Sequence, residues 1–168
     1  GEFGVQAILV VEDNVRFASS FLPLIYREVM AQSRRLVTEG VNLAHKLLRV
    51  QARPKILLCR IFDEAWTLFE AYQAHVLGVI SDIEFPMEGN LRADAGAEFV
   101  RRARSFEPDM PILLQSSFRE NEAVARSVGA SFLLKNSPTL LAQLRQFMME
   151  HFSFGDFVFR LPDGTDVA

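Results

Sequence analysis

Carboxylate, hydroxyl and ammonium side chains stand at or just beyond the ends of short apolar segments in this chain. These side chains are Glu12, Asp13, Asp82, Glu84, Ser116, Ser117 and Lys135. Carboxylates that lie together repel and raise one another's pKa unless a hard cation lies among them, and Mg²⁺ prefers such oxygen ligands. With a hydroxyl and an ammonium group, such a site can hold a phosphoryl group, and an aspartate can be its acceptor. The residue types therefore point to Mg²⁺-dependent phosphoryl chemistry.

The elements that must position these groups alternate between strand and helix. Short apolar runs predict strands at Val5–Val11, Lys55–Cys59, Val76–Ile80, Ile112–Gln115 and Ser131–Leu134. Amphipathic patterns predict helices at Asp63–His75, Ala95–Phe106, Asn121–Val128 and Thr139–Phe152. This alternation is typical of a doubly wound α/β fold with a five-stranded parallel sheet. Ligands of such sheets lie at the carboxyl ends of the strands, where the acidic, hydroxyl and lysine side chains fall.

Two connections are larger than such a fold requires. Residues 15–54 form an enlarged first crossover whose apolar positions recur at helical spacing, namely Phe17, Phe21, Ile25, Val29, Val37, Val41, Ala44 and Leu48. Gly40 and Asn42 can divide it into two helices. Pro23 fits a first helical turn if Ser20 caps the helix, and otherwise kinks it. Pro86–Asp94 reads as a polar, turn-rich loop after Asp82.

Composition limits the class of protein. The 168 residues suit one domain, and with 49% apolar and 23% charged residues the chain is neither disordered nor fibrous. No apolar run is long enough for a membrane-spanning helix and no secretory signal is visible, so we expect a cytoplasmic protein without membrane partners. The single cysteine, Cys59, cannot form an internal disulfide and is expected to be a buried thiol.

Charge is unevenly distributed along the chain. The stretch Val15–Arg60 holds nine Lys or Arg and two Asp or Glu, although the whole chain has a net charge of −3. A basic segment can attract nucleic acid, but no recognisable reader motif is present, so we expect a protein–protein surface and no nucleic acid. The apolar spacing within residues 15–54 also permits a homodimer through this helical region.

The sequence resembles the receiver domains of two-component response regulators over residues 5–152. The resemblance rests on four stretches: Ile8-Leu-Val-Val-Glu-Asp-Asn14, Ser81-Asp82 with Pro86, Pro111-Ile-Leu-Leu-Gln-Ser-Ser117, and Gly129-Ala-Ser-Phe-Leu-Leu-Lys135. It implies a flavodoxin-like sheet with strand order 2-1-3-4-5.

The resemblance also implies roles for the acidic residues. Asp82 would be the phosphoacceptor and Asp13 a direct Mg²⁺ ligand, whereas Glu12 would assist through water. The backbone carbonyl of Glu84 would complete the protein ligands, together with Asp82 itself.

Three further residues would contact or respond to the phosphoryl group. Ser116 would contact it, Lys135 would pair with it, and Phe132 occupies the position of the family's switch aromatic. Each residue also has an ordinary structural explanation when taken alone: Asp13-Asn14 can cap a helix, and Phe132 can pack in the core. The chemical interpretation depends on their occurring together.

The chain departs from the family pattern in several places. Members usually have a proline directly after the lysine, but here Asn136 and Ser137 precede Pro138. The glycine that opens the family's third helix is matched by Gly96, after a longer loop. Residues 153–168, with a strand expected at Phe157–Arg160, read as a tail or linker towards a further domain. This tail and the basic insertion resemble receiver-like domains at the front of phosphoenolpyruvate synthase-like proteins.

The resemblance implies a phosphorelay module, with a histidine kinase or phosphotransfer protein as donor and an attached or separate output domain. It would be no enzyme beyond its own phosphorylation and dephosphorylation. An alternative is a non-phosphorylated interaction module that regulates an attached enzyme or output domain.

A third hypothesis, a metal-dependent enzyme on nucleic acid, rests on the faint similarity of Glu12 and Asp82-x-Glu84 to a Toprim acidic set. The overall acidic charge and the poor fit of Lys135 argue against it.

Overall fold

The structure is a computed structural model that describes residues 6–38, 54–152, 159–160 and 166–167. Its central sheet consists of β1 (Ala7–Val11), β2 (Lys55–Cys59), β3 (Val76–Asp82), β6 (Ile112–Ser116) and β7 (Ser131–Leu134). All neighbouring strands in this sheet are parallel, and their order is β2-β1-β3-β6-β7. The doubly wound sheet and the order implied by the resemblance are therefore confirmed.

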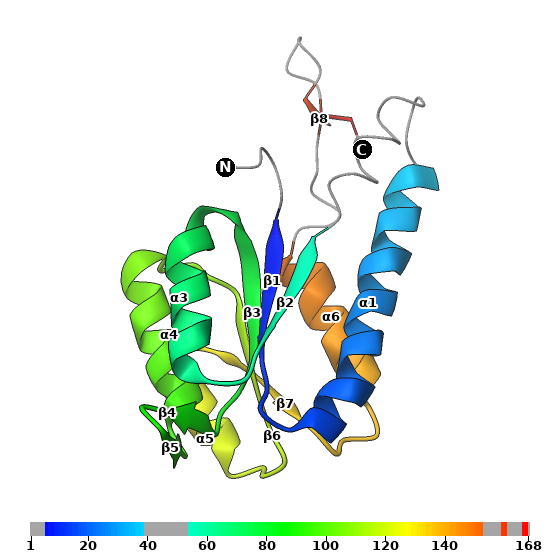
Figure 1. Ribbon diagram of the computed structural model, residues 1–168. Coiled ribbons are helices and arrows are strands. Elements are labelled where there is room, and N and C mark those ends of the chain that lie inside the picture. Colours follow the sequence, from blue (N-terminus) through cyan, green and yellow to red (C-terminus); the bar gives the residue numbers. More distant parts are fainter. Residues whose placement is uncertain (1–5, 39–53, 153–158, 161–165, 168) are drawn as a thin grey trace.

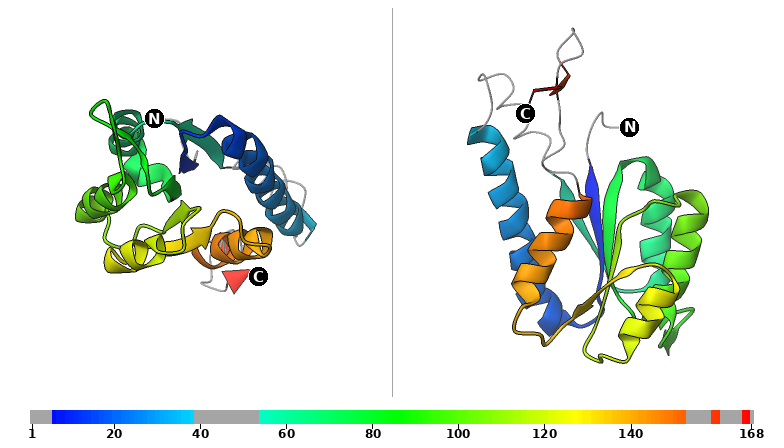
Figure 2. Two further views of the ribbon diagram at one scale, coloured as in Figure 1. Left: turned by 90° about the horizontal axis from the view of Figure 1, so that it is seen from below. Right: turned by 180° about the vertical axis from the view of Figure 1, so that it is seen from behind.

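Helices cover both faces of the sheet (Figure 1). One face carries α1 (Val15–Thr38) and α6 (Leu140–His151). The other carries α3 (Phe62–Tyr72), α4 (Ala95–Phe106) and α5 (Asn121–Ser127). Figure 2 shows the two layers from below, with the sheet between them. Among the described helices, none is long and apolar enough to cross a membrane.

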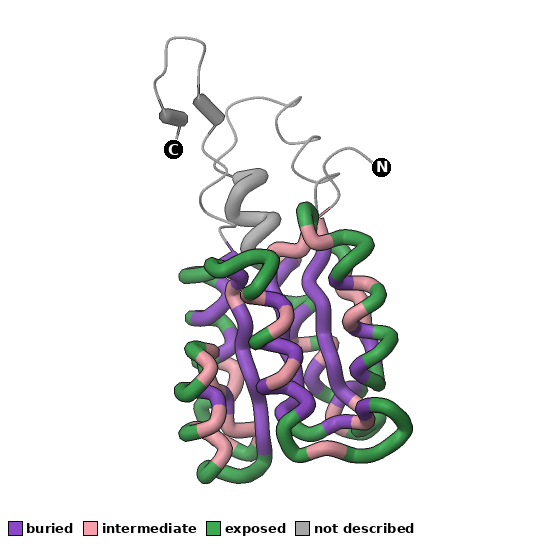
Figure 3. The backbone as a smooth tube through the Cα atoms, turned by 90° about the vertical axis from the view of Figure 1, so that its left-hand side faces the viewer, coloured by how far each residue is buried: buried purple, intermediate pink, exposed green. Residues whose placement is uncertain are grey.

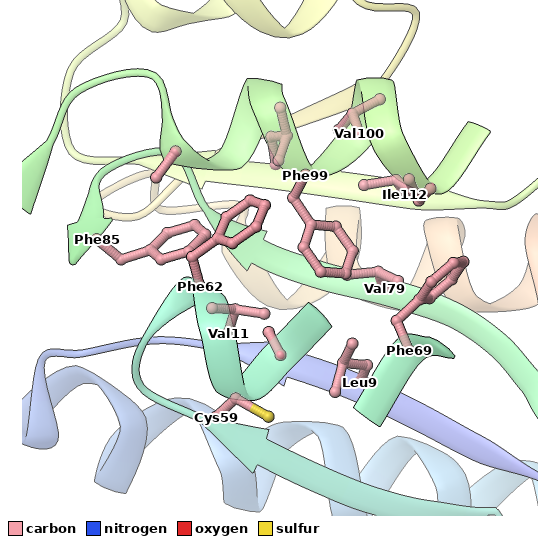
Figure 4. Packing of buried hydrophobic residues seen from close by; sticks show 14 of the residues in the cluster. Leu9, Val11, Cys59, Phe62, Phe69, Val79, Phe85, Phe99, Val100 and Ile112 are labelled. Atoms are coloured by element: carbon pink, nitrogen blue, oxygen red, sulfur yellow. The ribbon is translucent and has the colours of Figure 1, made fainter. Parts of the chain in front are cut away.

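Two hydrophobic cores hold these layers on the sheet, and the strands between them are mostly buried, as Figure 3 shows. The first core packs Phe62, Phe69 and Phe99 of α3 and α4 against Leu9, Val79 and other strand residues (Figure 4). The second core packs α1 and α6 against the opposite face. Cys59 is fully buried in the first core, so the expected buried thiol is confirmed, and burial raises its pKa to about 12.

Helix α1 begins earlier than one sequence interpretation allowed. Its first turn is capped by Asn14, whose Oδ1 accepts the Phe17 N–H at 3.1 Å. Phe21, Ile25 and Val29 follow at four-residue intervals and are buried, as their spacing predicted. Pro23 lies inside this helix, so a start capped by Ser20 is wrong. The predicted break at Gly40 and Asn42 lies outside the described residues.

The segment after Asp82 is not only a loop. Phe85–Met87 (β4) and Asn90–Arg92 (β5) pair as an antiparallel hairpin, so the expectation of a turn-rich loop over Pro86–Asp94 is corrected. Burial explains the difference, because Phe85 and Met87 alternate into the first core. The turn places Glu88 and Gly89 at positive φ.

Other boundaries differ by a few residues from the sequence prediction. The last turn before β3 is the 3₁₀-helix η1 (Gln73–His75), and β3 extends to Asp82 itself. Within the predicted tail, β8 (Phe159–Arg160) pairs antiparallel with β9 (Asp166–Val167), which confirms strand structure at the described end of Phe157–Arg160.

Gly96 allows α4 to approach the end of β3. Its N–H donates to the Ile83 carbonyl at 2.8 Å. A Cβ atom at this position would lie 2.5 Å from the Asp82 carbonyl oxygen and 2.8 Å from the Ile83 Cα atom. Both are backbone atoms, which cannot move aside as a flexible side chain would.

We therefore expect Gly96→Ala to lower the free energy of unfolding by about 2–3 kcal/mol, because the added methyl forces α4 away from β3. Urea denaturation followed by circular dichroism measures this loss. Gly89→Ala is the matched control, since its Cβ would meet nothing within 4 Å and only its φ of +81° is unfavourable. Equal losses for the two variants would show that the close approach at Gly96 is unimportant.

Candidate functional site

The sheet brings the predicted chemical groups to one edge. Glu12 and Asp13 follow β1, Asp82 ends β3, Ser116 ends β6 and Lys135 follows β7. The register aligns these ends, because Val11 pairs with Ser81, Asp82 with Gln115, and Ser116 with Leu134. The carboxyl ends of the strands lie at the lower edge of the molecule in Figure 1. The parallel sheet thus brings together stretches that are remote in sequence.

Lys135 forms the centre of the site. Its Nζ lies 2.7 Å from Glu12 Oε2 and 3.0 Å from Asp82 Oδ2. The side chains of Lys135, Glu12 and Asp82 are only 10%, 0% and 12% exposed. The ammonium group also lies 4.3 Å from the centroid of the Phe17 ring on α1, within the range of a cation–π contact.

Glu12 is held by several hydrogen bonds. Its Oε1 accepts the Asn14 N–H at 2.9 Å, and its Oε2 accepts the Gln115 side-chain amide at 3.2 Å in addition to Lys135. These bonds tie β1, β6 and the residue after β7 to one carboxylate. Glu12 is therefore the buried counter-ion of Lys135. Its predicted water-mediated contact with a metal stays a prediction.

Burial and neighbouring charges shift the pKa values of Asp82 and Lys135, which face each other. The pKa of Asp82 is raised to about 7, first by burial and then by the negative charge of Glu12, although Lys135 lowers it. Burial opposes the charged form of Lys135, but its hydrogen bonds and charge interactions with Glu12 and Asp82 outweigh this, so its pKa is raised. Without a cation, the site therefore resists ionisation of Asp82.

The acidic residues fit a divalent cation. Glu12, Asp13 and Asp82 each offer a carboxylate oxygen, and these oxygens lie within 4.8 Å of one another. Two of these carboxylates contact the Lys135 ammonium and the third lies beside them, so the cluster has an excess of negative charge when all groups are ionised. Hard oxygen donors with this charge suit Mg²⁺. Asp13 remains accessible to solvent, whereas the Glu84 side chain is exposed and its predicted carbonyl ligation stays a prediction.

Ser116 is buried, with 4% of its surface exposed. Residues of the segment that follows it form hydrogen bonds with its side chain. Its Oγ accepts the Phe118 N–H at 3.0 Å and the Asn121 side-chain amide at 2.8 Å. Its predicted contact with a phosphoryl group stays a prediction. Phe132 is half-buried and packs against the first core, as its structural explanation required. Its role as a switch stays a prediction.

Sequence reasoning missed three residues of the site. Gln115 is fully buried and contacts Glu12, Asn121 contacts Ser116, and Phe17 lies against Lys135. The sequence did offer a clue to Gln115, because a polar amide side chain ends an otherwise apolar strand immediately before Ser116. It offered none to Phe17 and Asn121, since an aromatic on a helical stripe and an asparagine at a helix start are common.

Comparisons with solved structures give the class of the fold. A response regulator receiver domain protein from Clostridium thermocellum is similar with a TM-score of 0.59 and 17% identity, covering 88% of this chain and 94% of that chain. The chemotaxis protein CheY4 of Vibrio cholerae is similar with a TM-score of 0.54 and 19% identity, covering 85% of this chain and 98% of that chain. A two-component response regulator of the LuxR family from Aurantimonas sp. is similar with a TM-score of 0.59 and 17% identity, covering 89% of this chain and 86% of that chain.

These neighbours are receiver domains at low identity and high coverage, so the chain has the CheY-like receiver fold. No sequence model of a protein family matches the chain, and no curated protein matches it by sequence. The likeness therefore establishes the architecture alone, and the acidic cluster of this chain lies at the carboxyl edge of its sheet.

The raised pKa of Asp82 has a consequence for stability. Above pH 7 the folded, metal-free protein must hold an ionised, buried Asp82, whereas the unfolded chain ionises it near its ordinary pKa of 3.8. We expect Asp82→Asn to stabilise the metal-free protein by about 2 kcal/mol at pH 8, because the amide removes this penalty. The gain should shrink as the pH falls from 7 to 4, where the folded carboxyl group is protonated.

Chemical denaturation in the presence of EDTA, at a series of pH values, measures the difference between the two proteins. Addition of Mg²⁺ should stabilise the parent chain more than the variant. Asp109→Asn, an exposed aspartate remote from the cluster, is the control and should change little at any pH. A variant that is less stable than the parent at pH 8 would mean that the Lys135 ion pair outweighs the burial of Asp82.

Proposed function

We propose that this chain is the phosphoacceptor receiver module of a phosphorelay. Asp82 would receive a phosphoryl group from a histidine donor in a Mg²⁺-dependent reaction, and the change would be passed on as a conformational signal. The observation that carries this proposal is the buried contact of Lys135 with both Asp82 and Glu12, beside the accessible Asp13. A salt bridge that served stability alone would not need a third carboxylate at the same edge.

The residues present suit the transfer step. Asp82 Oδ1 accepts the Ile83 N–H at 2.9 Å and Oδ2 accepts Lys135 at 3.0 Å, so the carboxylate is held in one orientation. A bond forms between an Asp82 oxygen and phosphorus while the phosphorus–nitrogen bond of phosphohistidine breaks, and its electron pair stays with the imidazole. Bound Mg²⁺ would neutralise charge on the phosphoryl oxygens and favour ionised Asp82.

Lys135 would then change partners. Its ammonium already lies beside Asp82 Oδ2, so it would pair with a phosphoryl oxygen attached to that carboxylate. Ser116 would contact another phosphoryl oxygen, and Asp13, Asp82 and the Glu84 carbonyl would hold the metal. The conformational change would alter the face around Ser116 and Phe132. Because Asn136 stands where the family has proline, this change would differ from the family's usual one.

The partners follow from this reaction. A histidine kinase or phosphotransfer protein would supply the phosphoryl group, and an attached or separate output domain would respond to it. The receiver-like unit would span residues 5–152, with residues 153–168 leading to the output domain. Dimerisation through residues 15–54 stays a prediction, since part of that segment lies outside the described residues.

Acetyl phosphate with Mg²⁺ is expected to add one phosphoryl group to the chain, because it can replace a phosphohistidine donor. Intact-mass measurement detects the adduct, and hydroxylamine should remove it as an acyl phosphate. Asp82→Asn should abolish the adduct, and EDTA should prevent it. Asp109→Asn, the matched control, should leave it unchanged.

A chain that folds normally but gains no phosphoryl group under saturating donor and Mg²⁺ would contradict the proposal. That result would favour the second candidate, a receiver-like interaction module that does not use phosphorylation. The observation that supports this candidate is the sequence after Lys135, which lacks the family's Lys-Pro step.

A further inference from the structure

The hydroxyl of Ser116 is engaged by two donors from the segment that follows it. Its oxygen accepts two hydrogen bonds, one from the Phe118 N–H at 3.0 Å and one from the Asn121 Nδ2 at 2.8 Å. A serine hydroxyl has two acceptor lone pairs and one donor hydrogen. With both lone pairs engaged, only the hydrogen is left for a further partner.

Ser116 lies between the two charged residues of the proposed reaction. Its carbonyl accepts the Lys135 N–H at 2.9 Å, and the preceding residue, Gln115, is the register partner of Asp82. The Nζ of Lys135 is in turn 3.0 Å from Asp82 Oδ2. Ser116 is therefore on the strand between those that carry the acceptor and the lysine, at the same edge of the sheet.

Asn121 is well placed to hold the hydroxyl in this state. It is the first residue of α5, it is half-buried, and its own N–H donates to the Phe118 carbonyl at 3.1 Å. The N-cap residue of α5 is Glu120, and the side-chain amide of Asn121 in the first turn donates to Ser116 Oγ. The loop from Ser116 to Asn121 thus closes on the serine oxygen from two sides.

We propose that Asn121 is a positioning residue that fixes the direction of the Ser116 hydroxyl hydrogen. By occupying a lone pair, the Asn121 amide leaves the hydroxyl as a donor to an anionic phosphoryl oxygen on Asp82. A hydrogen bond to an ionised acceptor is about twice as strong as a neutral one, so the direction of this hydrogen matters for affinity. This inference rests on the proposed function.

The test uses the full chain with Mg²⁺ and beryllofluoride, an analogue of a phosphoryl group bound to a carboxylate. Fluorine NMR titration gives its dissociation constant. We expect Ser116→Ala to weaken binding about tenfold or more, and Asn121→Ala about three- to tenfold. Because Asn121 acts through the serine, the double variant should bind no more weakly than Ser116→Ala alone.

Further measurements separate positioning from a structural role. The affinity for Mg²⁺ alone should not change in Asn121→Ala, because no proposed metal ligand is altered. Asn121→Asp should weaken beryllofluoride binding more than Asn121→Ala, since a carboxylate accepts the serine hydrogen and adds negative charge. Asn90→Ala, an exposed asparagine in the β4–β5 hairpin, is the matched control and should bind as the parent does.

The outcomes distinguish this inference from the proposed function. A parent chain that fails to bind beryllofluoride with Mg²⁺ overturns both. A parent chain that binds, with Asn121→Ala equally tight or tighter, overturns the inference alone. Tighter binding would mean that the amide has the opposite orientation and accepts the serine hydrogen. Losses that add in the double variant would equally show that Asn121 does not act through Ser116.

Discussion

The site depends on one buried ammonium group that faces two carboxylates. Moving the charges of Lys135, Glu12 and Asp82 out of water is costly, and hydrogen bonds from Asn14 and Gln115 offset part of this cost at Glu12. The charges do not balance, because one ammonium cannot neutralise both carboxylates. Burial first, and then this imbalance, raise the pKa of Asp82, and the excess negative charge is the physical reason that the edge favours an additional cation.

The remainder of the fold keeps this unfavourable cluster in place. Parallel pairing aligns the strand ends, Gly96 lets α4 close on the last residues of β3, and Glu12 accepts a backbone N–H from the turn into α1. Two separate hydrophobic cores then fix the helices on each face. Apolar packing raises the free energy of unfolding, and the burial of charged groups at the polar edge lowers it.

The sequence contained enough to predict the sheet and the convergence of the acidic, hydroxyl and lysine residues. Near-continuous apolar strands such as Ala7–Val11 identify a parallel sheet, and parallel strands carry their terminal residues to one edge. The sequence did not allow the contact partner of each side chain to be predicted. That Lys135 contacts Glu12, or that Phe85 and Met87 turn an apparent loop into a hairpin, depends on packing between segments remote in sequence. The Ser20 cap failed because Asn14 offered an earlier one.

The site also touches both layers of the molecule. Three residues after Asp82, Phe85 is fully buried and its ring stacks with Phe62 of α3 at 6.2 Å. On the opposite face, Lys135 lies against Phe17 of α1, whose ring stacks on the buried Phe21 at 5.1 Å. The segment that follows Asp82 therefore packs in the first core, and the Lys135 ammonium beside Asp82 contacts an aromatic ring that packs against the second core.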